Sequence, residues 1–273
     1  MIDGLLVNLG RLVRLGGIVV LGVATLATTV VVVAPRVADI AKAHRFEMPP
    51  VTLEPLSERS YVYDRNGDLM ATFVAEQNRV LVDIADVPRT VIDSVLAAED
   101  SSFYSHHGVN ARSIGRALTA NIESGGVAQG GSTITQQVVK NSITGGDQDF
   151  ARKIEEAVLA VELEERYTKD EILERYLNTI YLGSGAYGVQ AAAEVYFNKD
   201  VGALDWSEAA MLAGLIRCPN SCDPFRSTAA ARVRRNTVID SLYTTGRIDE
   251  LERDVAKFTQ LPEEAHLPQR PND

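Results

Sequence analysis

The sequence contains few residues of several chemically specialised kinds. Among 273 residues there are two cysteines, four histidines and one tryptophan, and aromatic residues make up 6% of the chain. Basic residues are also in deficit, because 27 Lys and Arg stand against 37 Asp and Glu, which gives a formal net charge of −10. A chain this acidic is a poor candidate for general nucleic-acid binding, which requires Lys and Arg to replace the counterions of the phosphates.

Apolar residues, in contrast, are plentiful. Hydrophobic residues make up 45% of the chain and charged residues 23%. This composition is typical of a folded protein and excludes collagen-like, low-complexity and fully disordered chains. The length allows one large domain or two small ones, since domains run roughly 100–200 residues.

The charge is distributed unevenly, and the basic end of the chain contains a long apolar run. Residues 1–45 hold five basic and two acidic residues, which leaves 22 basic and 35 acidic residues in 46–273. Residues 16–34 are 19 residues without a charge, close to the roughly 20 that cross a bilayer core. We therefore predict a transmembrane anchor at 16–35, after a cytoplasmic tail at 1–15 and before a juxtamembrane stalk at 36–58.

A cleaved signal peptide is the alternative for this run. Its apolar region would be shorter, roughly 7–15 residues, although Ala41 and Ala43 offer a weak cleavage site. The positive charges on the two sides of the run do not decide its orientation.

The two cysteines, Cys218 and Cys222, flank a Pro-Asn-Ser turn. A disulfide between them would close a very small loop and would require an oxidising compartment. Two free thiols fit the same spacing. A metal site would need further ligands nearby, and the neighbouring sequence offers none.

The rest of the chain predicts a small β element followed by helices. Alternating apolar residues on both sides of Asn66-Gly67 indicate a β-hairpin, and residues 80–82 offer a further short strand. After Pro88 the apolar residues recur at helical spacing. Helices are expected after Pro88, around 114–122, and over 133–143, 149–166, 169–181, 186–197, 207–217, 228–245 and 249–258.

Capping signals support several of these helices. Thr168 with Glu171, Ser207, and Asp249 with Glu252 are expected starts, and Gly246 is an expected stop. The predicted fold class is mainly α: one helical domain over 59–258 with a small β-hairpin at its start, followed by a Pro-rich linker or tail at 259–273.

Four clusters of chemically useful residues lie between residues 99 and 197. The first begins with Glu99 and Asp100, two adjacent carboxylates at a helix end that would repel them. The second contains GGSTITQQ at 130–137, whose hydroxyls and amides could present donors to an anion at a helix start. The third is RKIEE at 152–156, and the fourth is KDEILERYLN at 169–178, with further glycines and aromatics up to Phe197.

Taken singly, each cluster has an ordinary structural explanation. Thr133 with Gln136 makes a capping box, and Arg152 with Glu156 makes an i, i+4 helix pair. His106 would most often be a hydrogen-bonded structural residue.

Taken together, in this order and spacing, the clusters resemble glycosyltransferase family 51, the peptidoglycan glycosyltransferases. That family occurs as monofunctional transglycosylases and as the amino-terminal part of class A penicillin-binding proteins. The strings EDxxFxxHxG, GGSTITQQ, RKxxE and ILExYLN carry the resemblance, and EAAMLAGL at 208–215 resembles the family's last motif. The resemblance covers residues 58–245 and implies a lysozyme-like helical lobe with a smaller jaw lobe, preceded by one transmembrane helix.

The resemblance also implies an activity and a location. The activity is polymerisation of lipid II into β-1,4-linked glycan strands, with inversion and release of undecaprenyl pyrophosphate. The location is the outer face of the bacterial cytoplasmic membrane, in a single-pass protein. The implied partners are lipid II, the growing glycan strand, the membrane, and proteins of cell-wall synthesis or division; nucleic acid is not among them.

The roles of individual residues follow the same resemblance. A hydroxyl that attacks must lose its proton to a base, and Glu99 matches the catalytic Glu. Glu156 matches the second essential Glu; beside a pyrophosphate it must bind a divalent metal (Mg²⁺ or Mn²⁺), pair with a cation, or be protonated. No organic cofactor is implied. The expected substrate-binding residues are Asp100, Phe103, His106, Arg116, Gly131, Ser132, Thr133, Gln136, Gln137, Lys140, Arg152 and Lys153.

Some features depart from the family or leave alternatives open. Residues 147–150 lack the basic residue that often precedes RKxxE, and the cysteine pair lies where the family usually has a Pro-rich loop without such a pair. No serine begins Ser-x-x-Lys and Lys-Thr-Gly is absent, so penicillin-reactive serine machinery is not in this sequence. The sequence fits a monofunctional enzyme or the first part of a longer one. A lysozyme-like glycan hydrolase and a catalytically dead membrane scaffold are the alternative functions.

Overall fold

The computed structural model describes residues 51–73, 77–110, 131–144 and 150–266. The chain divides into two compact units, residues 1–50 and 51–273, and all described residues belong to the second. The predicted anchor at 16–35, the expected helix around 114–122 and Arg116 therefore lie outside the described residues. Among the residues that are described, no helix is both long and apolar enough to cross a bilayer.

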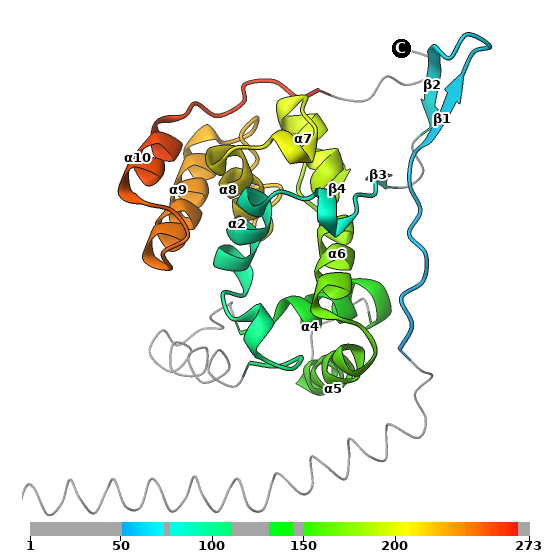
Figure 1. Cartoon of the computed structure of the whole chain (residues 1–273), viewed down its shortest axis with the longest axis vertical. Helices are drawn as coiled ribbons and strands as arrows, with labels where there is room; N and C mark the ends of the chain where they lie inside the picture. The colour runs from blue at the N-terminus through cyan, green and yellow to red at the C-terminus, as the bar shows by residue number, and fades with distance from the viewer. Residues whose placement is uncertain (1–50, 74–76, 111–130, 145–149, 267–273) are drawn as a thin grey trace, which may run out of the picture. The chain divides into compact units, whose positions relative to one another are not determined.

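The β element has the predicted hairpin and one pairing that was not predicted. Strands β1 (Ser60–Tyr63) and β2 (Leu69–Phe73) pair antiparallel around the Asn66-Gly67 turn, and the hairpin stands beside the helices in Figure 1. The expected strand at 80–82 is wrong: β3 (Asn78–Arg79) instead pairs in parallel with β4 (Ala186–Tyr187).

The side chain of Asn178 hydrogen-bonds to the backbone groups of Val82 that the expected strand would have used for pairing. The amide of Asn178 accepts from the Val82 N–H at 3.0 Å and donates to the Val82 carbonyl at 2.8 Å. Because this one side chain satisfies both backbone groups of Val82, these groups are not available for pairing with a strand.

Most of the remaining described elements are helices, as predicted. The α-helices are α2 (Arg89–Glu99), α4 (Ile134–Val139), α5 (Phe150–Arg166), α6 (Lys169–Thr179), α7 (Val189–Phe197), α8 (Trp206–Leu215), α9 (Thr228–Thr244) and α10 (Glu250–Phe258). Short 3₁₀ turns η1 (Ile84–Asp86), η2 (Phe103–Ser105) and η4 (Val201–Ala203) and a π-helical turn η3 (Lys140–Thr144) complete it.

Capping explains where most helices begin. The boxes of Thr168 with Glu171 and of Asp249 with Glu252 are confirmed. Ser207 as a helix start is wrong, because Asp205 accepts from the Glu208 N–H and is the N-cap of α8. The helix expected at 186–197 begins only at 189, because residues 186–187 form β4 and Gly188 has φ +81°.

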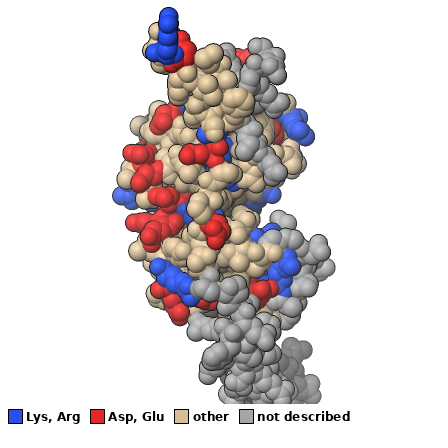
Figure 2. Space-filling model, turned by 90° about the vertical axis from the view of Figure 1, so that its right-hand side faces the viewer, with Lys and Arg blue, Asp and Glu red and all other residues tan. Residues whose placement is uncertain are grey.

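Two groups of helices position the candidate site (Figure 1). Helix α8, which is buried along nearly its whole length, packs against α2, α9, α7 and α10. Helix α4 packs against α5 and α6. The segment 99–108 leaves the end of α2 and contacts the start of α4, so the first two sequence motifs meet where the two groups meet. Figure 2 shows one face of the molecule on which Asp and Glu side chains form separate patches, mainly on the left and in the centre, among a majority of other residues.

Candidate active site

Glu99, the last residue of α2, has a nearly buried carboxylate with a donor on each oxygen. Its side chain is 6% exposed. Gln137 Nε2 donates to Glu99 Oε2 at 3.0 Å, and Arg217 Nε donates to Oε1 at 2.9 Å. The second and first motifs thus meet at this carboxylate, and an arginine from the segment after α8 completes its surroundings.

Gln137 is itself oriented by a buried tyrosine from the fourth motif. The hydroxyl of Tyr176 donates to Gln137 Oε1 at 3.1 Å, so the amide nitrogen is the end that faces Glu99. Tyr176 is fully buried, and burial raises the pKa of its hydroxyl well above the ordinary value, with the Glu99 charge acting in the same direction. Tyr176 therefore remains a neutral donor at physiological pH.

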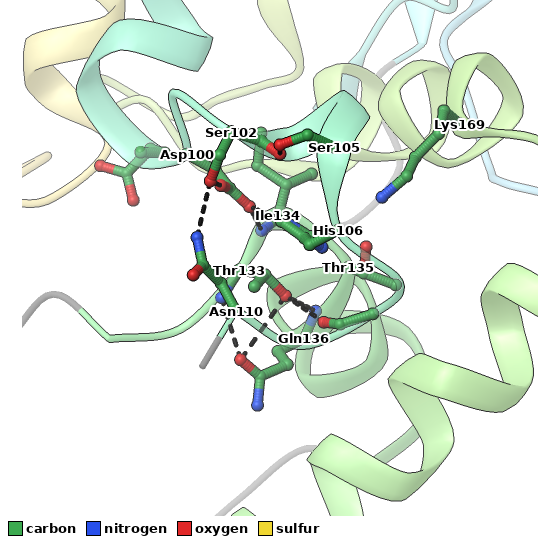
Figure 3. Close-up of polar contacts among 12 residues, drawn as sticks. Asp100, Ser102, Ser105, His106, Asn110, Thr133, Ile134, Thr135, Gln136 and Lys169 are labelled. Carbon is green, nitrogen blue, oxygen red and sulfur yellow. Dashed lines mark hydrogen bonds and ion pairs between the residues drawn. The ribbon is translucent and has the colours of Figure 1, made fainter. Parts of the chain in front are cut away.

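Asp100 turns away from Glu99 and binds the start of α4. Its Oδ2 accepts from the Ile134 N–H at 3.2 Å and lies 2.8 Å from His106 Nε2 (Figure 3). A carboxylate is favourable at a helix N-terminus, where the unpaired N–H groups point outward. Asp100 and His106 therefore join the first motif to the helix of the second, in the structural role that was the alternative for His106.

Other residues of the two motifs pack the same junction. Thr133, buried, donates through Oγ1 to the Gly108 carbonyl at 2.6 Å and forms the predicted capping box with Gln136. Phe103 is 1% exposed, and Lys169 Nζ lies 4.4 Å from the centroid of its ring. The side-chain oxygen of Gln136 accepts from the Thr133 N–H at 2.9 Å. Thr133, Gln136 and Phe103 thus build the frame of the site.

The second candidate glutamate lies on α5 with a cation of its own. Glu156 is 3% exposed, and its Oε2 lies 2.6 Å from Lys153 Nζ, whose side chain is half exposed. Pairing with a cation, one of the three possibilities for Glu156, is therefore present in the form of the contact with Lys153. The i, i+4 pairing of Arg152 with Glu156 stays a prediction.

The remaining candidate cations lie on elements that pack together. The π-helical turn η3 begins at Lys140 and packs against α5. Arg152 Nη1 donates to the carbonyl of Thr144, the last residue of that turn, at 3.3 Å. Lys140, Arg152, Lys153 and Glu156 thus belong to one pair of packed elements, while Gly131 and Ser132 are half-buried before α4.

A divalent metal at Glu156 stays a prediction. Mg²⁺ is usually held by one or two carboxylates together with water and substrate phosphates, and the Glu156 carboxylate has the Lys153 ammonium against it. In the described parts of the chain, no group of three or more His, Cys, Asp or Glu side chains could hold a metal ion.

Sequence reasoning missed two residues of the site, Arg217 and Tyr176. Arg217 lies 118 positions from Glu99 and outside the four clusters, so nothing local indicates the contact. Tyr176 lies inside ILExYLN, but its helical spacing is that of an ordinary core residue. The cysteines, left open from spacing, form a disulfide with a Cα–Cα distance of 5.3 Å.

Comparison with known proteins identifies relatives for most of the described chain. A family model described as "Transglycosylase" matches residues 66–243. Penicillin-binding protein 1F of Bacillus subtilis (strain 168) is 42% identical over 206 residues, which are 76% of this chain and 29% of that protein. Penicillin-binding protein 1A of Haemophilus influenzae is 44% identical over 201 residues, which are 74% of this chain and 23% of that protein.

A longer alignment and one solved structure complete the comparison. Penicillin-binding protein 1A of Neisseria flavescens is 38% identical over 250 residues, which are 92% of this chain and 30% of that protein. A crystal structure of penicillin-binding protein 1A from Haemophilus influenzae matches 81% of this chain and 23% of its own chain, with 26% identity and a TM-score of 0.45. The chain spans less than a third of the length of each of these relatives.

Proposed function

This chain belongs to the transglycosylase family, and from that premise we propose that it is a peptidoglycan glycosyltransferase. The growing glycan, held as a lipid pyrophosphate, is the donor, and the 4-hydroxyl of an incoming lipid II sugar is the acceptor. The observation that carries the proposal is the Glu99 carboxylate, nearly buried and held on both oxygens by Gln137 and Arg217.

Glu99 acts as the general base. The acceptor hydroxyl forms a bond to the anomeric carbon, the bond from that carbon to the phosphate oxygen breaks, and the pyrophosphate leaves with the electron pair. Glu99 takes the hydroxyl proton during the attack. Each carboxylate oxygen has two lone pairs, so the bonds from Gln137 and Arg217 leave acceptor capacity for that proton.

The leaving pyrophosphate is stabilised by the cations on η3 and α5. Negative charge builds up on it in the transition state, where fixed cations are most effective. Lys140, Arg152 and Lys153 are the residues for this role, and Ser132 adds a neutral donor. Glu156, buried against Lys153, fixes the position of that ammonium.

The finer architecture belongs to the same proposal. We expect the domain to consist of a lysozyme-like helical lobe and a smaller jaw lobe. We also expect residues 16–35 to anchor the chain in the bacterial cytoplasmic membrane, with the catalytic domain over 59–258 on the outer face. At this location we also expect proteins of cell-wall synthesis or division as partners.

The test is polymerisation of purified lipid II by the full chain and by Glu99→Gln. We expect long glycan chains from the wild type, and a loss of about 1,000-fold or more from the variant, because a general base typically contributes 10²–10⁴-fold. The amide is isosteric with the carboxylate but has a single acceptor oxygen, so it can accept from only one of the two donors, Gln137 or Arg217. The variant should therefore still fold, with a somewhat lower melting temperature, and circular dichroism checks that the loss of turnover is not a loss of fold.

The same experiment separates the alternatives. Cleavage of preformed glycan without polymerisation would identify a hydrolase, and near-wild-type polymerisation by Glu99→Gln would contradict the role of Glu99. Wild-type protein that neither polymerises nor cleaves would favour a scaffold. A parallel reaction with a chelator tests metal dependence. Turnover that is lost to the chelator and restored by Mg²⁺ or Mn²⁺ would assign a metal to Glu156, and undiminished turnover would leave the pairing with Lys153.

A further inference from the structure

Arg217 hydrogen-bonds both to the Glu99 carboxylate and to the backbone at the end of α2, the helix that carries Glu99. Its Nε donates to Glu99 Oε1 at 2.9 Å, and its Nη2 donates to the Ala98 carbonyl at 3.1 Å. Two donors on one rigid guanidinium fix the carboxylate relative to the backbone, which a single point charge would not do. A cation is also favourable at this place because α2 ends there and the C-terminal end of a helix carries partial negative charge.

The backbone next to Arg217 is closed by the disulfide. Helix α8 ends at Leu215, and the Cys218 N–H donates back to the Leu215 carbonyl at 3.0 Å. The Cys222 N–H donates to the Cys218 carbonyl at 2.8 Å, and the two sulfurs are bonded. Arg217 is therefore one peptide bond from a turn that is closed by both a hydrogen bond and a covalent bond.

The far side of this turn is attached to the segment after α6. Ser184 Oγ donates to the buried carboxylate of Asp223 at 2.7 Å, and Phe225 stacks on Tyr196 with centroids 5.3 Å apart. Gly183 has φ +88°, and a Cβ there would lie 2.4 Å from the Pro219 carbonyl oxygen. These contacts fix the position of residues 219–225. The disulfide joins this part of the loop to Cys218, the residue next to Arg217.

We propose that Arg217 is a positioning residue for the Glu99 carboxylate, and that the Cys218–Cys222 disulfide holds Arg217 in place. The proposal rests on the proposed function of Glu99 as the base. An arginine side chain that is 35% exposed has many alternative rotamers, and exposed ion pairs are weak when both partners are free to move. Constraining the backbone beside it keeps the guanidinium on the carboxylate, where a misplacement of about 1 Å would cost about 100-fold in rate.

The first arm of the test measures kcat and KM for lipid II polymerisation by the full chain and its variants. Arg217→Ala should lower kcat about tenfold or more, with KM for lipid II changed less than about twofold, because a misplaced base acts on the transition state and not on substrate binding. Arg217→Lys should recover part of the loss. The matched control is Arg226→Ala, an exposed arginine beyond the same disulfide, which should keep the wild-type kcat.

The second arm uses the redox state of the loop. A small dithiol reduces the S–S bond to two thiols, and its own two thiols become a cyclic disulfide, so electrons and protons balance. Reduction should lower the wild-type kcat several-fold, and reoxidation should restore it. The double variant Cys218→Ser/Cys222→Ser should start at the reduced level and not respond to the dithiol.

The outcomes separate this inference from the proposed function. If Glu99→Gln is inactive while Arg217→Ala turns over at the wild-type rate, the positioning role is wrong and the base stands. If Glu99→Gln is active, the base assignment is wrong. An unchanged kcat on reduction, with the loss of the disulfide verified by thiol titration, overturns the role of the cysteines.

Discussion

Glu99 and Asp100 are adjacent in the chain, yet their carboxylates bind partners from different helices. At the end of α2 two negative charges would be unfavourable, and the structure separates them. Arg217 pairs with Glu99 and also covers a carbonyl of α2, while Asp100 reaches the first N–H of α4. The adjacency that is puzzling in the sequence therefore gives one carboxylate for chemistry and one for joining two motifs.

At the same scale, we expect Tyr176→Phe to lower turnover through Gln137. The Tyr176 hydroxyl fixes which end of the Gln137 amide faces Glu99. Loss of a hydrogen bond of about 1 kcal/mol corresponds to about a fivefold lower rate if its effect falls on the transition state. The measurement is kcat for lipid II polymerisation.

Tyr196→Phe is the matched control for that variant. Tyr196 is equally buried, and its hydroxyl donates to the Leu182 carbonyl at 3.0 Å, not to a group that contacts Glu99. Phenylalanine keeps the ring that stacks on Phe225, so the loop that carries Arg217 keeps this contact. It should lose similar stability and keep its kcat. Equal kcat losses in both variants would mean that Tyr176 acts only through stability.

At the scale of elements, α4 is short and depends on its neighbours. It has six residues, and helices of this length are not stable alone in water. Its start is held by the Thr133–Gln136 capping box, by Asp100 and by the bond from Thr133 to the Gly108 carbonyl. The Gly-rich motif thus forms a helix because the first motif supplies part of its cap.

Gly108 is the tightest point of this arrangement, which gives a stability prediction. It has φ +75°, and a Cβ would lie 2.7 Å from the backbone of Ala160 and Val161 on α5. Gly108→Ala should lower the free energy of unfolding by about 3 kcal/mol or more, since left-handed strain costs about 1–2 kcal/mol and overpacking a further 1–3. Chemical denaturation measures the change.

Gly185→Ala isolates the part of that cost that is due to strain. Gly185 has nearly the same φ, +76°, and a Cβ there would have no other atom within 4 Å. It should lose only about 1–2 kcal/mol. Equal losses at the two positions would show that the loop can move away from α5 without cost.

At the scale of the whole molecule, net charge and substrate have the same sign. Residues 46–273 carry 35 acidic and 22 basic residues, yet the proposed donor is a pyrophosphate. Binding must therefore come from local cations, on η3 and α5, and from lipid retained in the membrane. This makes the attachment of the chain to the bilayer part of the proposed function.

The anchor prediction is tested by extraction of membranes with alkaline carbonate, which releases peripheral proteins but not transmembrane ones. The full chain should stay in the pellet, and a chain starting at residue 51 should be released, because the predicted span lies at 16–35 and no described helix can cross a bilayer. N-terminal sequencing of the mature protein gives the control. A mature chain that begins near Ala43 would mean a cleaved signal peptide.

Features that depend on near neighbours in the chain could be predicted before the fold was known. The turn at Asn66-Gly67, the capping boxes at Thr168 and Asp249 and the run of helices all follow from contacts a few residues apart. The family could likewise be identified from the motif strings, because their order and spacing are properties of the sequence. These could be predicted because backbone geometry and side-chain periodicity are local.

Only the tertiary structure decided the contacts between distant parts of the chain. The bond of Arg217 to Glu99 spans 118 positions, Tyr176 reaches Gln137 across 39, and Asn178 takes the backbone of Val82 away from the expected strand. The choice of a disulfide over two thiols likewise depended on how the turn after α8 folds. Such contacts are set by how helices pack, and the free energy of that packing is spread over many residues, so no local pattern records it.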